Sequence, residues 1–328
     1  MLNKSIKIFL KWILGPLLGV WLFHSLYIQV KDQPDLGHAW KMIKAVPFSA
    51  GAWKFWLVIL LVFINWGIEA IKWQALMSVI QKMSFLNAFR SVLCGVTFSL
   101  NLPNRMGEYA GRVLYVEEGK RLQSVSLSIA GSIAQLIITV LAGCLGIGYL
   151  LFGNPTLLLS IGLQSYWWYL FFYCSILILI LLFLFFFRLD WIVRLAERLP
   201  FGKRISKYIG VLKSFDAKIL LRLLVLSTLR YLVFILQYVL LLDVMNVEHY
   251  YWQSFWLITL LFWLLALIPS FAIAELGIRG TIAKTLFAYS SNLVGILAVT
   301  FTIWFINLFI PALIGSLLIL GIKIKKDK

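Results

Sequence analysis

Charged residues, histidine and cysteine are all scarce in this chain of 328 residues. Asp, Glu, Lys and Arg make up only 13% of the sequence, about half of the share that a soluble domain carries. The three histidines and three cysteines are scattered and show neither metal-ligand nor redox spacing. The Gly-x-Ser-x-Gly motif, the Walker loop and the Rossmann fingerprint are also absent. A soluble globular domain is therefore excluded, and we expect neither an enzyme nor a bound cofactor or metal.

Apolar residues, in contrast, are abundant. Hydrophobic residues make up 62% of the chain, its mean hydropathy is +0.93, and it has 25 Phe and 14 Trp. This composition is typical of an integral membrane protein, in which about 20 apolar residues form one crossing helix. The first apolar run is long and no small-residue cleavage site follows it, so we interpret it as a retained helix and not as a signal peptide. Six full spans are predicted, at residues 6–28, 54–79, 124–152, 166–187, 220–242 and 293–321.

The basic residues that give the chain its net charge of +17 are densest in one segment. Nine of them fall between Arg188 and Arg222, against three acidic residues. Such an excess of Lys and Arg between spans is typical of a cytoplasmic loop, and it can also attract anionic lipid of the inner leaflet. No aromatic and basic recognition module accompanies this charge, so we expect no nucleic-acid partner.

Two short segments, 102–112 and 268–280, share an unusual pattern. Each has a proline, a glutamate five or six residues later and an arginine four residues after that, with glycines between them. Proline interrupts a helix, and Glu and Arg at this spacing share one helix face, where they can form an ion pair. Breaks of this kind in the two halves of a membrane protein are typical of a transport site.

These motifs lie inside two pairs of apolar arms that are too short to cross a membrane comfortably. The first pair is 85–102 with 107–119, and the second is 254–268 with 275–289. Basic residues flank the first pair, whereas acidic residues without nearby Lys or Arg precede the second. Because cytoplasmic loops carry the excess of basic residues, we expect two re-entrant hairpins that enter the membrane from opposite faces.

The sequence therefore predicts one all-α transmembrane domain over 1–328, with six full transmembrane helices and two oppositely oriented re-entrant hairpins that form an inverted repeat. Repeat A covers about 54–152, repeat B covers about 220–321, and 188–222 is a basic cytoplasmic loop. Both termini are expected on the cytoplasmic side of the cytoplasmic (inner) cell membrane. The lysines of 31–54 favour the reverse orientation, which would keep the opposed hairpins and change only their sidedness.

Helices that start after the two breaks would direct free N–H groups into the protein, where they favour phosphate or carboxylate. Arg105, Arg112 and Arg279 add cations beside these breaks. We favour ion pairing for Glu108 and Glu275, and titration as a proton-coupling carboxylate is the alternative. Kinked helix ends with snorkelling charges are the simplest alternative for both motifs. The candidate substrate-binding residues are Asn104, Arg105, Gly107, Glu108, Arg112, Arg230, Glu275, Gly277 and Arg279.

Other polar residues inside the spans have simpler interpretations. Arg230 should face a cavity or an acidic partner, with snorkelling toward the cytoplasm as the alternative. Glu69 and Lys72 can pair at i,i+3, although an interfacial anchor formed by Lys72 and Trp73 is the interpretation that we favour. Three single amide side chains are interpreted as partners in interhelical hydrogen bonds, namely Gln135, Gln237 and Asn307.

The residues that carry a family resemblance are Lys72-Trp73 with Leu76, Asn101-Leu102-Pro103-Asn104-Arg105-Met106-Gly107-Glu108 leading to Arg112, and Pro269 followed by Glu275-Leu276-Gly277-Ile278-Arg279-Gly280. Together with the span count and the length, they resemble the lysylphosphatidylglycerol synthase transmembrane family, a flippase-like module, over essentially the whole chain. The resemblance implies an inverted-repeat fold and movement of aminoacylated or glycosylated lipids between leaflets. The aminoacyl-transferase domain of fused family members does not follow the last span, so we do not expect synthesis of a lysyl-lipid.

The function that we expect is translocation of an anionic, aminoacylated, glycosylated or polyprenyl-phosphate lipid between membrane leaflets. The expected partner is thus a membrane lipid, which is bound through its anionic head group. One alternative is a membrane scaffold that serves a separate lipid-modifying glycosyltransferase or synthase, and that enzyme would then be a second partner. The other alternative is a small-solute transporter. The sequence carries no signal for an oligomeric state.

Overall fold

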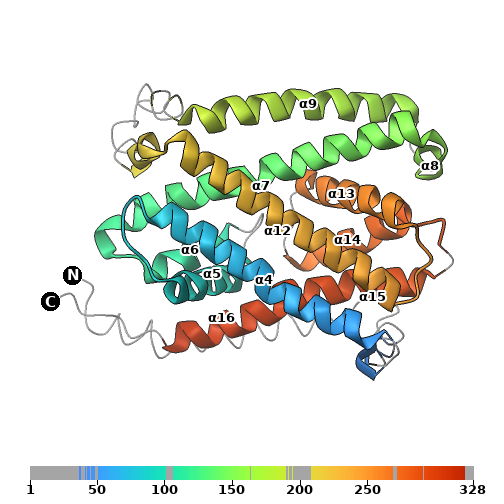
Figure 1. Cartoon of the computed structure of the whole chain (residues 1–328), viewed down its shortest axis with the longest axis horizontal. Helices are drawn as coiled ribbons and strands as arrows, with labels where there is room; N and C mark the ends of the chain where they lie inside the picture. The colour runs from blue at the N-terminus through green and yellow to red at the C-terminus, as the bar shows by residue number, and fades with distance from the viewer. Residues whose placement is uncertain are drawn as a thin grey trace.

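The computed structural model describes residues 51–100, 106–162, 164–189, 208–268, 272–290 and 292–321, together with single residues between 37 and 48 and at 191 and 194. All of the regular secondary structure in these ranges is helical, which agrees with the predicted all-α class. The predicted first span 6–28 lies outside the described residues, as do Asn104 and Arg105 of the candidate site. The long helices run roughly along one axis of the molecule, which is horizontal in Figure 1.

Five helical segments of the described ranges are long and apolar enough to cross a membrane. They correspond to five of the six predicted spans, and the remaining span is the one outside the described residues. The fold is thus that of an all-helical membrane protein. The five segments are α4 (Ala52–Met77), Glu118–Gly153 with α7 (Arg121–Gly148) inside it, α9 (Ser165–Phe187), α12 (Ala217–Val244), and Leu293–Gly321 with α15 (Leu293–Trp304) and α16 (Ile310–Gly321).

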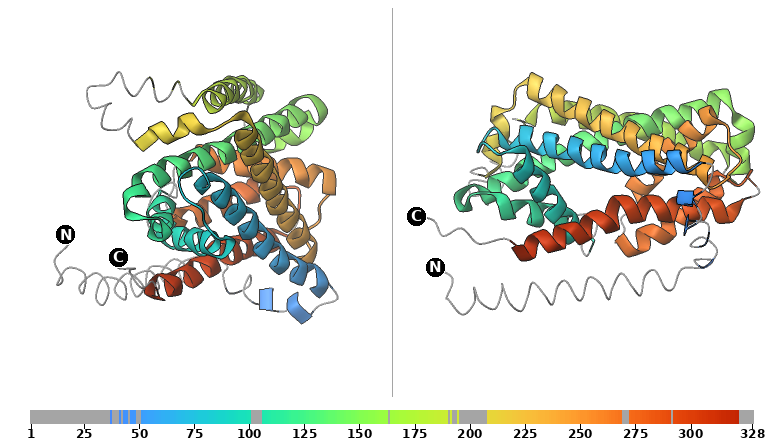
Figure 2. Two further views of the ribbon diagram at one scale, coloured as in Figure 1. Left: turned by 60° about the vertical axis from the view of Figure 1, so that its left-hand side comes forward. Right: turned by 60° about the horizontal axis from the view of Figure 1, so that its bottom comes forward.

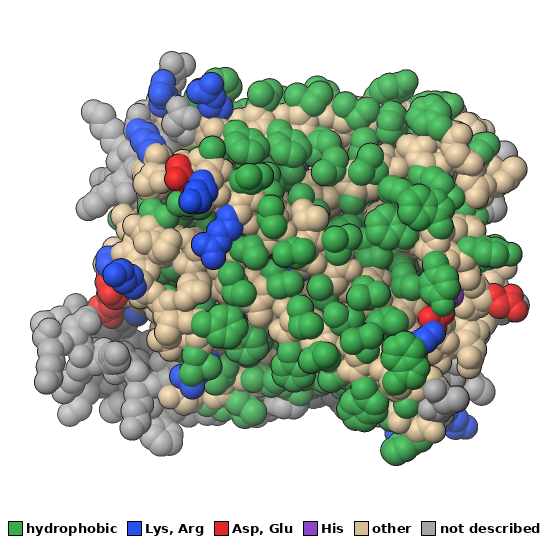
Figure 3. All heavy atoms as spheres, viewed as in Figure 1, with side chains coloured by type: hydrophobic (Ala, Val, Ile, Leu, Met, Phe, Trp, Pro, Cys, Tyr) green, Lys and Arg blue, Asp and Glu red, His purple; other side chains and the backbone are tan. Residues whose placement is uncertain are grey.

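The outer surface of the bundle suits hydrocarbon. Hydrophobic side chains cover the middle of the face shown in Figure 3, and the charged side chains on this face gather near its two ends. α9 has the smallest buried share among the five segments, and its buried residues are Trp168, Ser175 and Phe186. A helix that is apolar all round and so exposed has a surface that matches lipid tails.

Four shorter helices fill the two halves of the bundle. α5 (Phe85–Ser99) and α6 (Gly107–Arg112) lie in the half that contains the C-terminal end of α4, whereas α13 (Tyr251–Leu267) and α14 (Ala272–Leu286) lie in the other half (Figures 1 and 2). α5 has 15 residues and α13 has 17, so their lengths are about 22 and 25 Å at 1.5 Å per residue. Both are shorter than the hydrocarbon core of a bilayer, which is about 30 Å thick.

Glycines bring α6 against the backbone of α5. A methyl group built at Gly107 would overlap the carbonyl of Phe98, and one built at Gly111 would overlap the carbonyl of Cys94. Residue numbers rise along α6 as they fall along α5, so the two helices run antiparallel and form a hairpin. Gly315 of α16 approaches the backbone of α5 equally closely. α5 is therefore held at backbone distance by both α6 and α16.

Short irregular turns interrupt or join the helices. The π-helical turn η8 (Phe305–Phe309) separates α15 from α16, and it lies where Pro311 has no N–H to donate to the carbonyl of Asn307. The side chain of Asn307 is buried within this turn. The other short elements are η2 (Val46–Phe48), η4 (Val113–Tyr115), η5 (Glu118–Lys120), η6 (Tyr149–Gly153), α8 (Pro155–Ser160) and η7 (Gly210–Ser214).

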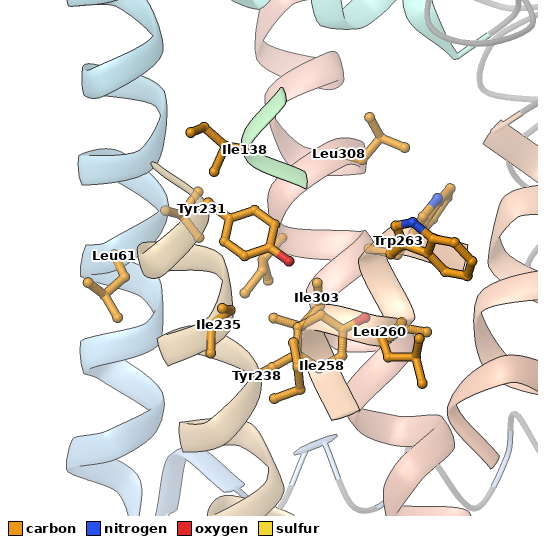
Figure 4. Packing of buried hydrophobic residues seen from close by; sticks show 14 of the residues in the cluster. Leu61, Ile138, Tyr231, Ile235, Tyr238, Ile258, Leu260, Trp263, Ile303 and Leu308 are labelled. Atoms are coloured by element: carbon orange, nitrogen blue, oxygen red, sulfur yellow. The ribbon is translucent and has the colours of Figure 1, made fainter. Parts of the chain in front are cut away.

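Apolar side chains of α12 and α13 pack together in the interior of the bundle. The rings of Tyr231 and Tyr238 each meet the ring of Phe262 edge-on, at 5.5 Å between ring centres. This packing fixes α12 beside α13 and thereby positions one side of the candidate site. Figure 4 shows the surrounding buried residues, among them Ile235 of α12, Ile258, Leu260 and Trp263 of α13, Ile303 of α15 and Leu308 of η8.

Candidate functional site

One buried carboxylate is shared by three cations. The oxygens of Glu69 on α4 lie 2.7 Å from Lys72 Nζ, 2.8 Å from Arg112 Nη2 of α6 and 2.9 Å from Arg230 Nη1 of α12. The exposed fractions of the four residues are 2–8%. A buried charge is costly unless it is paired and hydrogen-bonded, and each of these four groups has an oppositely charged partner. The cluster thus joins α4, α6 and α12.

Arg112 is positioned by the packing of α6 on α5. Its Nη2 atom also donates to Glu108 Oε2 at 2.9 Å, which makes an i,i+4 pair within α6. Its guanidinium lies over the ring of Trp73, at 5.3 Å from the ring centre. Arg112 therefore connects two carboxylates, Glu69 and Glu108, that come from different helices.

Arg230 is positioned by α12, which packs along α4. It donates through Nε to Asn65 Oδ1 at 2.9 Å, and its guanidinium lies 5.1 Å from the ring centre of Trp66. Asn65 and Glu69 are one helical turn apart on α4, so both present oxygens to this arginine. The acidic partner that was predicted for Arg230 is thus Glu69. The alternative of an arginine that snorkels toward the cytoplasm is wrong, because the side chain is buried.

The second motif forms the same kind of pair. Arg279 donates through Nη2 to Glu275 across one turn of α14, and it donates through Nη1 to Tyr238 Oη of α12 at 3.1 Å. Arg279 is 7% exposed, and Arg112 is 4% exposed. Both predicted i,i+4 pairs are present, Glu108 with Arg112 and Glu275 with Arg279. Snorkelling arginines would reach the surface, so that alternative is wrong for Arg112 and Arg279.

The two sets of ion pairs face one cavity inside the bundle. Its volume is about 470 Å³, which lies in the usual range of small-molecule sites. Arg112 pairs with two carboxylates of the wall. With it, the described groups comprise four cations and three carboxylates, so one positive charge is in excess when all are ionised, and this charge favours an anion. The charged residues of the wall itself are Glu69, Lys72, Glu108, Arg230, Glu275 and Arg279.

Two large exposed apolar residues line the cavity, and they are called its rim below. Leu136 of α7 and Ile268 at the end of α13 both line the cavity and are each 38% exposed. Leu136 lies near the middle of α7, several turns from either end of that helix. At this depth of a membrane-spanning helix, any surface of Leu136 on the outside of the bundle would face the hydrocarbon of the bilayer and not the water at its surface.

Two other predicted site residues, Gly107 and Gly277, are not part of the cavity wall. Gly107 packs against α5, where its lack of a side chain permits the backbone contact. Gly277 is exposed on α14, and a methyl group built there would meet nothing within 4 Å. Asn104 and Arg105 are outside the described residues. Gly107 thus permits close packing of two helices, whereas no close contact requires a glycine at position 277.

The carboxylate that the cations share was missing from the predicted site. Glu69 and Lys72 form the predicted i,i+3 pair, but an interfacial anchor of Lys72 and Trp73 is wrong, because both residues are buried. Trp73 donates instead to Ser91 Oγ of α5 at 3.0 Å. The signal that could have revealed the cluster is the presence of Glu69 in a long apolar span, since a carboxylate there needs a cation from another helix.

The three amide side chains in the spans differ in their contacts. Asn307 donates to Gln237 Oε1 at 3.1 Å and accepts from Asn65 Nδ2 at 3.2 Å, so amides of three segments are linked. The predicted interhelical hydrogen bonds are thus confirmed for Gln237 and Asn307. The prediction is wrong for Gln135, whose side chain lines the cavity and makes no hydrogen bond to the described residues.

The fold and the site together define a class, an all-helical membrane protein with a charged cavity inside its helix bundle. Within the described part of the chain, no group of three or more His, Cys, Asp or Glu side chains could hold a metal ion. No protein-family model matches the chain, and no curated protein matches it.

Proposed function

We propose that this protein moves a lipid with an anionic, aminoacylated or glycosylated head group, or a polyprenyl phosphate, between the two leaflets of a membrane. The observation that carries the proposal is the charged cavity, where carboxylates of both sequence motifs meet. The resemblance of the motifs to the lysylphosphatidylglycerol synthase transmembrane family supports the same function, and we propose that the chain is related to that family.

A lipid head group needs such a cavity because hydrocarbon disfavours charge. A charged side chain at the bilayer centre costs about 2.5–3.5 kcal/mol on the lowest scales, and more on others. Lys72, Arg230 and Arg279 line the cavity and would replace part of the water around an anionic head group. The rim beside Leu136 would let the acyl chains stay in hydrocarbon while the head group passes through the protein.

We further propose that α5 with α6 and α13 with α14 are the re-entrant hairpins of an inverted repeat. α5 and α13 are too short to cross a bilayer, and the two hairpins lie in opposite halves of the bundle (Figure 1). Each hairpin contributes one carboxylate to the cavity, Glu108 from the first and Glu275 from the second. A binding site between opposed repeats, near the bilayer midplane, is a common architecture of secondary transporters.

The distribution of charge supports an inner-membrane orientation with both termini in the cytoplasm. Lys120, Arg121 and Lys218 lie at the start of α7 and α12, at one end of the bundle. At the other end, Lys54 pairs with Asp243 at 2.6 Å. This ion pair neutralises one of the lysines that favour the reverse orientation, so the basic end is the better candidate for the cytoplasmic side.

Two tryptophan substitutions on α7 test the proposed function. Leu136 and Leu145 are both exposed, at 38% and 54%, but only Leu136 lines the cavity. The purified protein is reconstituted into liposomes with fluorescent phosphatidylglycerol, and quenching by dithionite reports the label that reaches the outer leaflet. We expect L136W to slow translocation severalfold, because the indole would fill the rim, and we expect L145W to match the wild type.

The same assay separates the alternatives. Equal rates in L136W and L145W would place the lipid path away from the cavity. A folded wild-type protein that moves no lipid, yet retains lipid through purification, would favour a scaffold for a separate lipid-modifying glycosyltransferase or synthase. Release of a trapped small anion from the liposomes, without lipid movement, would favour a small-solute transporter.

A further inference from the structure

One wall of the cavity is polar without being charged. Ser132, Gln135 and Thr139 of α7 all line the cavity, and their i, i+3 and i+7 spacing places them along one face of the helix. At 1.5 Å per residue they extend over about 10 Å. Tyr231 of α12 lines the same cavity. These four residues are called the neutral polar wall below.

Two members of the neutral polar wall have unused hydrogen-bonding capacity. The hydroxyl of Tyr231 and the Oε1 atom of Gln135 are buried, and neither has a hydrogen-bond partner among the described residues. Tyr231 is 5% exposed, and Figure 4 shows its hydroxyl directed away from α4. Thirteen buried side-chain N and O atoms of the described residues lack a hydrogen-bond partner, and Tyr231 Oη and Gln135 Oε1 are the two that belong to uncharged residues of the cavity wall, where a polar ligand would pair with them. Ser132 donates to the carbonyl of Ser128 and accepts from the Tyr109 hydroxyl at 3.5 Å. Thr139 donates to the carbonyl of Gln135, and its oxygen can accept from a ligand.

The charged groups of the cavity constrain the other part of the ligand. The ammonium of Lys72 has three N–H donors and one acceptor, Glu69, among the described residues. Because the charged cluster has one more cation than carboxylates, a phosphate diester would be attracted to it. Among the head groups considered above, the excess cation of the described groups thus favours those that carry a net negative charge.

We infer that the neutral polar wall is a subsite for hydroxyl groups, and that the lipid head group is a phosphate diester that carries a polyol, either glycerol or a sugar. This inference rests on the proposed function, because it names the head group that the same cavity takes. The hydroxyls of a polyol both donate and accept, so they can pair with Gln135 and Tyr231 together. The phosphate lies on the side of Lys72, Arg230 and Arg279.

Pairs of lipids, one member with and one without hydroxyl groups on its head group, test the inference. One pair is phosphatidylglycerol and phosphatidylpropanol, and the other is a hexosyl polyprenyl phosphate and a cyclohexylmethyl polyprenyl phosphate, which keeps a six-membered ring without hydroxyl groups. Both members of a pair carry a single phosphate diester. Native mass spectrometry of the detergent-purified full chain measures each dissociation constant. We expect the hydroxylated member to bind roughly tenfold tighter, which corresponds to one or two neutral hydrogen bonds. The pair with the larger ratio shows whether the polyol is glycerol or a sugar.

The double variant Q135M/Y231F removes the two polar groups with little change in side-chain volume. We expect the two dissociation constants of each lipid pair to lie within about twofold of one another for this variant, because only the hydroxylated lipid loses hydrogen bonds. Q123M is the matched control, since Gln123 lies on the same helix but outside the cavity, and it should keep the wild-type preference. Equal affinities within both pairs for the wild type, or a preference that survives in Q135M/Y231F, would overturn the inference.

Binding and translocation are measured separately, so that the two proposals can fail independently. If the wild type prefers the hydroxylated lipid in binding but moves neither lipid across liposomes, the subsite holds and the proposed translocation is wrong. If the wild type moves both members of each pair at the same rate and binds them equally, translocation holds and the hydroxyl subsite is wrong.

Discussion

Glu69 pairs with three buried cations, and burying any one of them without a counter-ion would cost free energy. Its Oε1 atom faces Arg112, and its Oε2 atom faces both Lys72 and Arg230. Breaking a buried ion pair costs more than the pair contributes, because the remaining charge stays in low dielectric without a partner. Three buried cations that share one carboxylate make this effect large. Glu69 of α4 therefore links α6 and α12 through the buried arginines Arg112 and Arg230.

The substitution Glu69→Gln keeps the shape of the side chain and removes its charge. We expect this variant to be less stable by about 3–5 kcal/mol, because three buried cations lose their shared counter-ion. Thermal unfolding of the detergent-purified protein measures the change. Glu117→Gln is the matched control: Glu117 lies 2.7 Å from Lys120 in an exposed pair, so its loss should cost less than about 1 kcal/mol. Equal stability of the two variants would contradict a structural role for the cluster.

Contacts in the site could be predicted from the sequence where both residues lie on the same helix. The i,i+4 pairs of both motifs follow from their spacing alone. Arg230 needed a partner because of its depth in a span, but the identity of that partner, Glu69, depends on how α12 packs along α4. In the same way, Gln135 and Gln237 are each a single amide in an apolar span, so the sequence does not distinguish them. After the helices pack, Gln135 lines the cavity and Gln237 accepts a hydrogen bond from Asn307.

Among the helices, the long ones could be predicted from the sequence more accurately than the short ones. Apolar length alone places the crossing helices of the described ranges to within a few residues, because the bilayer sets that length. The arm 107–119 is less regular than predicted: α6 ends at Arg112, and two 3₁₀ turns follow it. Glycine spacing marked both motifs, yet it did not show that Gly111 packs on backbone whereas Gly277 is exposed.

The close packing of α6 on α5 can be tested with a single methyl group. In Gly111→Ala the new Cβ would overlap the backbone carbonyl of Cys94, which cannot move aside as a side chain could. We expect a loss of about 1–3 kcal/mol or more in stability, and a weaker contact between Arg112 and Glu69. Gly277→Ala is the matched control within a helix. It has open space around it and should be neutral, or stabilising by up to about 1 kcal/mol.

Thermal unfolding of both glycine variants in detergent gives the comparison. An unchanged midpoint for Gly111→Ala would mean that α6 does not pack on α5 this closely in solution. A loss of stability in Gly277→Ala that equals the loss in Gly111→Ala would show that α14 also packs at backbone distance, contrary to the space seen around Gly277.

At the scale of the whole molecule, the cavity exists only where the two halves of the chain meet. Two segments of the first half and two of the second supply its charges, so neither half forms the site alone. The sequence predicts that two motifs share a site, but it does not predict the contribution of α4, since that depends on the packing of all the helices. The charged residues are Glu69, Lys72 and Glu108 from the first half and Arg230, Glu275 and Arg279 from the second.

The proposed orientation predicts which ends of the bundle face the outside of the cell. Glu118, beside the basic start of α7, and Glu248, beyond the end of α12, are both exposed and lie at opposite ends of these helices. In a chain whose native cysteines are replaced by alanine, we expect a membrane-impermeant maleimide to label Glu248→Cys on intact cells. Glu118→Cys should react only after permeabilisation, because the basic end stays in the cytoplasm. The reverse pattern would mean that the lysines of 31–54 outweigh the basic loop 188–222. The two proposed re-entrant hairpins would then keep their opposite orientations and exchange the faces from which they enter the membrane.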